Sequence, residues 1–402
     1  MIQIGKFIKG DKVIWALALL MALLSFLAVY SASSHMALKH ETAIGTIVLK
    51  HLFFLVTGFS LMYMAHSIPY RYFGGIAVIM LPVAMLLLAL TLLQGGSSNG
   101  TNDSRWLNFM GLSFQTSTFA SLVLYVYVAR YLSKNLLNKP SLKNAFFPLL
   151  LPIALVCALI LPANLSTAVI VFFTSLVLMF VGHFPLKNML FIILIGLGSL
   201  IGFVLLVKAF PQISNRVDTW QGRLEAYWDG PSEKSYQVQK AHLAIAQGGL
   251  FGMGAGKSTQ KNFLPQSNSD FIYAIIVEEY GLLGGLFVLA LFIWLFVRIL
   301  KTATKAPTVF GSLLTVAAGS GIMLQAFINM GVAVSIFPVT GQTLPLISQG
   351  GTAIWMNCLA LGIILSVSRA ERGEEIPMAD ETKPEFTASE NPQSQAHEEA
   401  IA

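Results

Sequence analysis

The feature that most constrains this chain is a series of ten apolar runs, each long enough or nearly long enough to cross a lipid bilayer. A membrane-spanning helix needs about 20 mostly apolar residues, with roughly 17 as the lower limit. Lipid offers no partners to backbone polar groups, so runs of this length must be helices. The ten predicted spans are Val13–Tyr30, His51–Ile68, Tyr72–Leu93, Leu112–Ala129, Ala145–Pro162, Leu165–Val181, Met189–Val207, Phe271–Val297, Val309–Met330 and Leu346–Val367.

The composition excludes a soluble enzyme and indicates an all-α polytopic membrane protein. Only 11% of the 402 residues are charged, whereas a soluble domain has about 25%. The net charge of +6 reports topology and not a nucleic-acid partner, because Lys and Arg gather in cytoplasmic loops of membrane proteins. Cys157 and Cys358 each stand in an apolar run, and we interpret both as packing residues.

Basic residues in the short loops predict that both termini are cytoplasmic. Most of them fall on the side that holds the N-terminus, namely Lys6, Lys9, Lys12, Arg130, Lys134, Lys139, Lys143, Arg298, Lys301, Lys305, Arg369 and Arg372. The short loops of the opposite side hold only Lys39, Lys50 and Arg105. The first apolar run imitates a signal peptide, but its 18 residues exceed the usual length of about 7–15. We therefore interpret it as an uncleaved first helix.

Two segments lie outside the predicted spans: one follows the membrane domain of residues 1–370, and the other is a loop within it. Residues 371–402 are rich in Glu, Pro, Ser, Thr and Gln and hold nine of the 19 acids, so we expect a disordered acidic cytoplasmic tail. Residues 208–270 form a 63-residue extracytoplasmic loop between the seventh and eighth spans. Its length predicts a functional or disordered segment, and its apolar stretches favour an ordered loop that rests on the bilayer surface.

The sharpest local signal is Asp270, which ends the large loop and precedes an apolar helix. One interpretation is helix capping, in which Asn268, Ser269 or Asp270 accepts hydrogen bonds from free N–H groups at the positive end of the helix dipole. The other is a partly desolvated carboxylate that takes a proton from a substrate hydroxyl. These residues alone favour the cap, because caps are far commoner than catalytic acids.

Glu278 and Glu279 are the only charged residues within the ten predicted spans. Charges there are expensive and often functional. Neighbouring positions on a helix diverge by about 100°, so the two side chains are not expected to share one line of contact. A structural pairing with a basic residue or a wet cavity, and a role in proton coupling or substrate contact, are equally compatible with the sequence.

Three further segments have both a structural and a functional interpretation. The glycines of residues 252–256 suit flexible turns, or they expose N–H groups that join Lys257 and Lys261 in binding the phosphates of a lipid-linked substrate. Residues 338–351 suit a loop, or a broken helix that lines a cavity. Arg105 suits an interfacial anchor. No His, Cys or carboxylate spacing indicates a metal site and no cofactor is evident, although a divalent cation is compatible with the sequence.

Taken together, these segments resemble the SEDS family (shape, elongation, division and sporulation), whose members include FtsW and RodA. The resemblance runs from about Asp11 to Arg369. It is carried by Tyr30–Ser33, Arg105–Asn108, Tyr236–Gln237, Gln247–Gly252, Gly256–Lys261, Leu264–Pro265, Ser269–Ile272, Glu278–Gly281 and Pro338–Gly351. So many motifs in one order make the resemblance specific.

The resemblance implies a glycosyltransferase that polymerises lipid II into β-1,4 glycan strands of peptidoglycan. It implies that Asp270 takes the proton of the acceptor's GlcNAc 4-hydroxyl as that oxygen attacks the donor's anomeric carbon, with inversion and release of undecaprenyl pyrophosphate. One base suffices because pyrophosphate leaves without protonation, unlike a sugar hydroxyl. The motifs also mark substrate-binding candidates, namely Arg105, Lys257, Ser258, Gln260, Lys261, Glu278, Glu279, Thr340 and Ser348.

The resemblance further implies a place in the bacterial inner membrane, with the active site on the outer face. The implied partners are lipid II, a class B penicillin-binding protein that supplies transpeptidation, and other division proteins. The acidic tail favours an FtsW-like septal role over RodA-like elongation. Two other classes stay open from the residues alone: a flippase for lipid-linked sugars, which the membrane glutamates suit equally well, and a scaffold in which Asp270 is only a cap.

In three segments the chain departs from the pattern of the resembled family. One is the stretch before Asp270, where relatives often carry a Glu after the proline and this chain has Gln266. Where relatives carry a Glu and, three residues later, a Lys, this chain has Thr118 and Ser121. Where they carry an Asp between the fifth and sixth spans, it has Asn164. Three acids and one Lys of the family's pattern are therefore neutral here, which calls into question the polar network that the resemblance implies for the cavity.

Overall fold

Helices dominate the computed structural model, which describes residues 9–33, 44–95, 106–109, 112–135, 142–209, 216–228 and 236–374. Arg105 and the predicted disordered tail beyond residue 374 lie outside these described residues. The elements in chain order are α1 (Lys12–Ala32), α3 (Ile44–Ser67), α4 (Arg71–Gly95), β1 (Leu107–Phe109), β2 (Leu112–Phe114), α5 (Thr116–Asn135), α6 (Leu142–Ala145), the π-helical turn η3 (Phe146–Leu150), α7 (Leu151–Ile160), α8 (Leu165–Val181), α9 (Leu186–Ala209), α10 (Arg216–Trp228), α11 (Tyr236–Gly248), the 3₁₀ turn η6 (Gln260–Asn262), α12 (Ile272–Lys305), α13 (Val309–Ala333) and α14 (Thr352–Glu371).

Eight of the described helices are long and apolar enough to cross a membrane, which confirms a polytopic, mostly helical membrane protein. They are α1, α3, α4, the continuous helix Leu142–Ile160, α9, α12, α13 and α14. Two predicted spans fall outside this set: α8 has only 17 residues, and α5 has 20 but ends in the polar sequence Ser133–Asn135. Both nevertheless pack against α13, inside the bundle.

Two predicted span boundaries were wrong. The fourth span was expected from Leu112, but residues 112–114 form strand β2, which pairs with β1 in an antiparallel hairpin that sets Leu107 opposite Phe114. The tenth was expected from Leu346, but α14 begins at Thr352. Short apolar runs look alike in helices, strands and buried loops; Leu346 and Ile347 belong to a buried loop.

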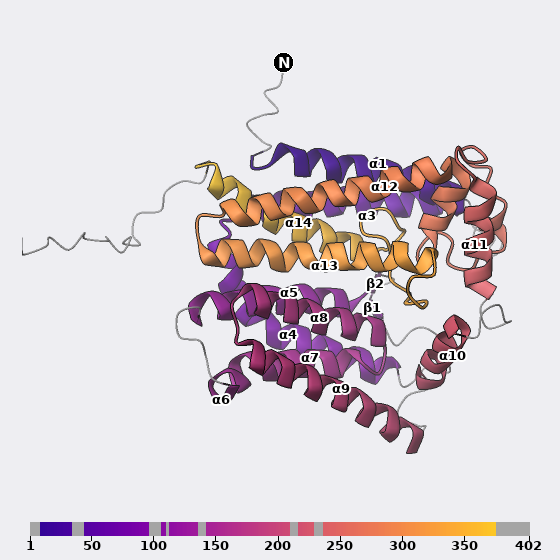
Figure 1. Ribbon diagram of the computed structural model, residues 1–402. Helices are drawn as coiled ribbons and strands as arrows, with labels where there is room; N and C mark the ends of the chain where they lie inside the picture. The colour runs from indigo at the N-terminus through magenta and orange to yellow at the C-terminus, as the bar shows by residue number, and fades with distance from the viewer. Residues whose placement is uncertain are drawn as a thin grey trace, which may run out of the picture.

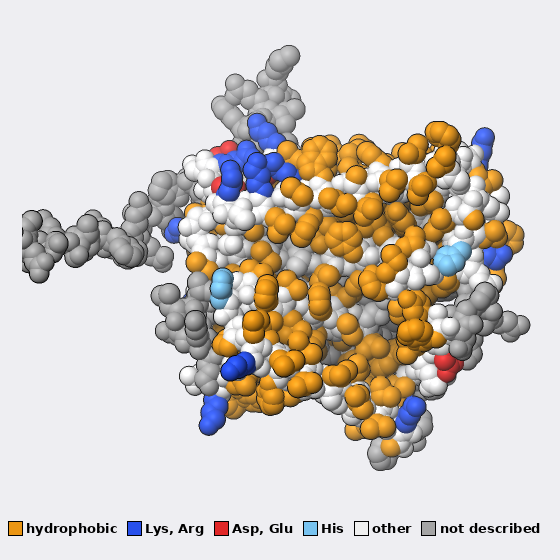
Figure 2. All heavy atoms as spheres, viewed as in Figure 1, with side chains coloured by type: hydrophobic (Ala, Val, Ile, Leu, Met, Phe, Trp, Pro, Cys, Tyr) orange, Lys and Arg blue, Asp and Glu red, His pale blue; other side chains and the backbone are white. Residues whose placement is uncertain are grey.

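The helices run side by side in two neighbouring layers (Figure 1): α1 and α3 from the start of the chain lie with α12, α13 and α14 from its end, and the helices from α4 to α9 form the other layer. Helix α13 joins the layers, because it packs against α12 and α14 on one side and against α5 and α8 on the other. Helix α9 lies at the edge and is the least buried of the candidate spans. Hydrophobic side chains cover the middle of the visible face (Figure 2), as lipid contact requires.

The two ends of the bundle differ in chemistry. Helices α10 and α11, from the predicted large loop, lie at one end (Figure 1), which we call the Asp270 end. At the other, which we call the Asp11 end, basic side chains gather (Figure 2). There the buried carboxylate of Asp11 caps α1 by accepting from Val13 N (2.8 Å). It also accepts from Arg298 Nε of α12 (2.9 Å), so one acid joins two helices.

Candidate active site

Asp270 lies immediately before α12 and is partly exposed. The N-cap residue of α12 is Phe271, which has no side-chain capping hydrogen bond. Asn268 and Ser269 bond elsewhere: Asn268 Nδ2 donates to Gln349 Oε1 (2.5 Å), and Ser269 Oγ donates to Gln266 Oε1 (2.7 Å). The N-cap residue itself therefore supplies no side-chain cap to this helix. A carboxylate at this place sits against the positive end of the helix dipole.

The backbone that carries Asp270 is held by the loop of residues 334–351, here called the α13–α14 loop. Gln349 N donates to Asn268 O (2.9 Å), and Ser348 Oγ donates to Ser269 O (2.6 Å). From α13, Asn329 Nδ2 donates to Asp270 O (2.8 Å). Three consecutive carbonyl groups are thus fixed from outside their own segment.

The α13–α14 loop has the irregular backbone that its prolines and glycines predict. Gln325 and Asn329 of α13 hold it by donating to Thr343 O (3.0 Å) and Gln342 O (2.6 Å). Ser348 is buried, and its hydroxyl also accepts from Leu344 N (2.7 Å). This predicted substrate-binding residue therefore supports the loop, whereas Thr340 is half-exposed.

Glu278 and Glu279 lie deep inside the protein, 0% and 1% exposed. Glu278 Oε1 accepts from Thr259 N (2.8 Å) and Gln260 N (3.1 Å), and its Oε2 accepts from the hydroxyl of Ser258. Glu279 accepts from Ser258 N (3.4 Å) and from the hydroxyl of Ser31 in α1. The two acids contact different atoms of Ser258 and otherwise have different partners, as expected of neighbouring helix positions. Two diverging side chains both reach a residue that lies between them.

A break in α12 explains how the loop reaches these acids. Gly281 has φ 71° and ψ −174°, so the next residues leave the helical pattern. Leu282 N donates to Gly249 O (2.8 Å) instead of to Glu278 O, which accepts from Met253 N (2.9 Å). A Cβ on Gly281 would lie 2.2 Å from Leu250 O. Only glycine permits this approach of two backbones.

The remaining predicted binding residues divide into an inner and an outer set. Ser258 and Gln260 are buried, with Gln260 Nε2 bonded to Gln247 Oε1 (3.1 Å). Lys261 Nζ donates to Gly256 O (2.8 Å) and so closes its own loop. Lys257 is exposed. The two cations therefore face outwards on a loop that the buried glutamates anchor.

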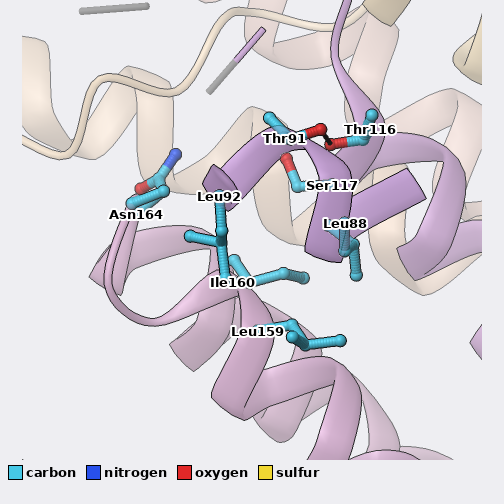
Figure 3. Close-up of a pocket in the computed structure, with 9 residues that line it drawn as sticks. Leu88, Thr91, Leu92, Thr116, Ser117, Leu159, Ile160 and Asn164 are labelled. Atoms are coloured by element: carbon cyan, nitrogen blue, oxygen red, sulfur yellow. Dashed lines mark hydrogen bonds between the residues drawn. The ribbon is translucent and has the colours of Figure 1, made fainter. Parts of the chain in front are cut away.

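Neutral polar side chains gather at the Asp270 end of α4, α5, α7 and α8. Thr91 and Thr116 are joined by a 3.0 Å hydrogen bond, and Asn164 caps α8 by accepting from Thr167 N (3.3 Å). With Ser117 they line a pocket of about 20 Å³ (Figure 3), which is room for one water molecule. Thr118 and Ser121, which take the place of charged residues, bond backbone carbonyls of their own segment: Gln115 O (2.8 Å) and Ser117 O (2.6 Å).

A much larger apolar groove of about 720 Å³ runs between α7, α8 and α9. Its walls include Leu161 and Leu165, at the ends of α7 and α8 that flank Asn164. Gln342 of the α13–α14 loop donates to Thr167 Oγ1 (3.0 Å) in the first turn of α8. Since Asn329 joins Gln342 to Asp270, hydrogen bonds link the groove's end to the site.

Sequence reasoning missed Gln325, Asn329, Gln342 and Thr167 as supports of the site. A signal was available for two of them: Gln325 and Asn329 are the two amide side chains of a mostly apolar helix, and they stand four residues apart on one face of it. Polar residues inside a span usually face partners within the bundle. Among the residues that the structure describes, no three His, Cys, Asp or Glu side chains gather to hold a metal ion.

Comparison with known proteins decides the family. A family model described as "Cell cycle protein", which covers FtsW, RodA and SpoVE, matches residues 11–373. The chain belongs to the FtsW/RodA/SpoVE family. Within that family it is 31% identical to stage V sporulation protein E of Bacillus subtilis over 364 residues, 90% of this chain and 98% of the relative. It is also 31% identical over 373 residues to a probable peptidoglycan glycosyltransferase FtsW of Geobacter metallireducens, 91% of this chain and 96% of the relative.

Two solved structures have a fold similar to that of this chain. The Thermus thermophilus rod shape determining protein RodA aligns with a TM-score of 0.64 and 25% identity, over 90% of this chain and 97% of that one. A chain from a study titled "Structural coordination of polymerization and crosslinking by a peptidoglycan synthase complex" aligns with a TM-score of 0.70 and 24% identity, over 90% and 98%. The family resemblance read from the motifs is confirmed.

Proposed function

We propose that this protein is a peptidoglycan glycosyltransferase that polymerises lipid II in the bacterial inner membrane. The observation that carries the proposal is membership of the FtsW/RodA/SpoVE family over residues 11–373, with near-complete coverage of relatives named as probable peptidoglycan glycosyltransferases. Relatives named FtsW and SpoVE favour septal or sporulation synthesis. An elongation role of the RodA type is the alternative that the fold also accommodates.

Asp270 is the proposed general base. It takes the proton of the acceptor's 4-hydroxyl while that oxygen forms a bond to C1 of the donor sugar and the bond from C1 to the pyrophosphate breaks. The product is a β-1,4 linkage and the leaving group is undecaprenyl pyrophosphate. The place of Asp270 at a helix N-terminus and its fixed backbone support this role, because a base must be held within hydrogen-bond reach of the proton that it removes.

The outward-facing Lys257 and the loop-closing Lys261 are the proposed contacts for substrate phosphates, together with Arg105 and Thr340. The apolar groove between α7, α8 and α9 is the proposed seat of a lipid tail. Its apolar walls suit a polyprenyl chain, and its end is bonded through Thr167 and Gln342 to the α13–α14 loop.

The proposed topology has ten spans, with α5 and α8 counted beside the eight longer helices, both termini cytoplasmic and the Asp270 end outside. Residues 1–370 form one membrane domain that is followed by a cytoplasmic tail. A crosslinking partner, such as a class B penicillin-binding protein, is proposed because a structural neighbour belongs to a study of coordinated polymerization and crosslinking.

Purified protein with its partner, given labelled lipid II, tests the proposal. Glycan strands that a muramidase digests are the expected product. Movement of lipid II across a vesicle membrane without polymer would instead indicate a flippase, and no reaction of lipid II under conditions where a family relative polymerises would indicate a scaffold.

A further inference from the structure

A buried histidine outside the proposed site contacts the loop that supports it. His51 of α3 and Ser25 of α1 are 1% and 0% exposed. The distance from His51 Nε2 to Ser25 Oγ is 2.7 Å, and Ser25 Oγ lies 2.7 Å from the carbonyl oxygen of Ile347 in the α13–α14 loop. Two helices from the start of the chain thus meet the loop at one hydroxyl group.

The direction of each hydrogen bond follows from what each atom can do. A carbonyl oxygen only accepts, so the single hydrogen of Ser25 goes to Ile347 O. Ser25 Oγ must then accept from His51, and Nε2 must carry the hydrogen. In the neutral ring Nδ1 keeps a lone pair, and this atom is buried without a hydrogen-bond partner among the described residues.

The unpaired Nδ1 makes a buried histidine unfavourable here, so the side chain must contribute something that an apolar residue would not. A buried acceptor without a partner is unfavourable, whereas an apolar side chain of similar size carries no such penalty. What the imidazole adds over leucine is one donor at Nε2, aimed at Ser25. His66 of the same helix also has one ring nitrogen, Nε2, without a hydrogen-bond partner among the described residues, but its Nδ1 lies 3.1 Å from Tyr63 O of its own helix and reaches no other element.

The bonded carbonyl lies directly beside the residues that hold the Asp270 segment. Ile347 is followed by Ser348, whose hydroxyl donates to Ser269 O (2.6 Å). Gln349 N then donates to Asn268 O (2.9 Å). A displacement of Ile347 is therefore passed through two adjacent residues to the segment that ends in Asp270.

We propose that His51 and Ser25 are positioning residues, which fix the α13–α14 loop through the carbonyl of Ile347 and thereby place the carboxylate of Asp270. The proposal rests on the function proposed above. A positioning role is expected to act on the rate of the chemical step, because small displacements of a catalytic group have large kinetic effects while binding is largely preserved.

The test compares four variants of the full-length protein, measured with its partner on lipid II. His51→Leu and Ser25→Ala remove the two donors, and we expect each to lower kcat about tenfold with little change in KM. The double variant should lose no more than about tenfold, because both changes break one chain of bonds. His51→Gln places an amide N–H near the Nε2 position and should restore kcat to within about threefold of the wild type.

Two matched controls separate positioning from general loss of stability. His66→Gln changes a buried histidine at the other end of α3, and Thr315→Val removes a buried hydroxyl that donates only to Gly311 O of its own helix (2.9 Å). Both should keep the wild-type kcat. Equal losses in the controls, multiplying losses in the double variant, or wild-type kcat in His51→Leu would each overturn the proposal.

Hydrogen–deuterium exchange gives a readout that does not depend on activity. In Ser25→Ala, we expect faster exchange in peptides that cover residues 265–271 and 344–350, with unchanged exchange in the last four turns of α12. If the wild type made no polymer but this pattern appeared, the proposed function would fail while the loop support would stand. If exchange in both segments stayed at the wild-type rate, the support itself would be wrong.

Discussion

The side-chain amide of Asn329 donates to the backbone carbonyl of Asp270 across 2.8 Å. The same Nδ2 lies 2.6 Å from Gln342 O, so one amide group ties α13, the α13–α14 loop and the start of α12 together. Because Asn329 is only 1% exposed, water does not take over its hydrogen bonds to the two carbonyl groups. The backbone that carries the proposed catalytic carboxylate is thus held by a polar residue near the C-terminal end of α13.

Asn329→Leu should therefore lower kcat by about 10- to 100-fold, because it releases the backbone beside Asp270 while keeping the side-chain volume. It should also lower the free energy of unfolding by about 1–3 kcal/mol for each carbonyl group left without a donor. Steady-state kinetics on lipid II and thermal unfolding measure the two effects. Thr315→Val, on the same helix, is the control for stability. A wild-type kcat in Asn329→Leu would contradict the role of Asn329 in holding the backbone of Asp270.

Glu278 should tolerate loss of its charge but not loss of its oxygens. In Glu278→Gln, the amide oxygen still accepts from Thr259 N and Gln260 N, and the hydroxyl of Ser258 turns to accept from the new NH₂ group. Glu278→Leu leaves these backbone donors unpaired, at a cost of about 1–3 kcal/mol each. Limited digestion with trypsin should then cut faster after Lys257 and Lys261 in the Leu variant than in the Gln variant or the wild type.

The same pair of variants tests the predicted substrate contact. If the carboxylate of Glu278 bound substrate, Gln would raise KM as much as Leu does. If Glu278 instead only supports the loop, KM should be near normal in Glu278→Gln. It should be raised in Glu278→Leu, because Lys257 and Lys261 are no longer held in place.

Gly281→Ala should destabilise the protein more than an ordinary glycine substitution at a positive φ. Its Cβ would lie 2.2 Å from Leu250 O, and that backbone atom does not move aside easily. Gly256→Ala is the matched control, because its φ is +77° and nothing lies within 4 Å of the added carbon. Unfolding experiments should show a loss above about 4 kcal/mol for Gly281→Ala and about 1–3 kcal/mol for the control; equal losses would argue against the close contact.

Filling the apolar groove should weaken binding of the long-chain substrate selectively. Ala158 lines the groove and is exposed there, so Ala158→Trp occupies space that we assign to a lipid tail. We expect KM for lipid II to rise about tenfold, a loss of about 1.4 kcal/mol in binding, with KM for a short-chain analogue unchanged.

Ile201→Trp, on a part of α9 that does not line the groove, is the control for a bulky change at the lipid-facing surface. An equal rise of KM for both substrates, or in both variants, would mean that the groove does not hold the tail.

Hydropathy and charge predicted the membrane body well because they report local demands of the bilayer. Spans must be apolar wherever they lie in the chain, so α1, α4, α9 and α13 could be found without knowing their neighbours. The errors at Leu112 and Leu346 have one cause. Leu112 lies in a strand and Leu346 in a buried loop, and hydropathy does not distinguish such apolar residues from those of a membrane-spanning helix.

The site itself was only partly predictable, because its supports pair residues that are far apart. Ser348 and Ser269, or Asn329 and Asp270, come together only when α13 packs against α12, and no local pattern encodes these partners. Glu278 and Glu279 stood out as rare charges, but their shared contact with Ser258 depends on the break at Gly281. The family resemblance, not the local pattern, singled out Asp270.

The most direct test of the central claim is the rate of lipid II polymerisation by Asp270→Asn, assayed with its partner beside the wild type and Glu225→Gln. Glu225 is an acid of α10 that bonds Gln221 within its own helix (2.8 Å), so its variant controls for loss of a charge in the large loop. We predict that Asp270→Asn loses at least about 100-fold in kcat, while Glu225→Gln and the thermal stability of both variants stay near the wild type. Polymer made by Asp270→Asn at the wild-type rate would contradict the mechanism.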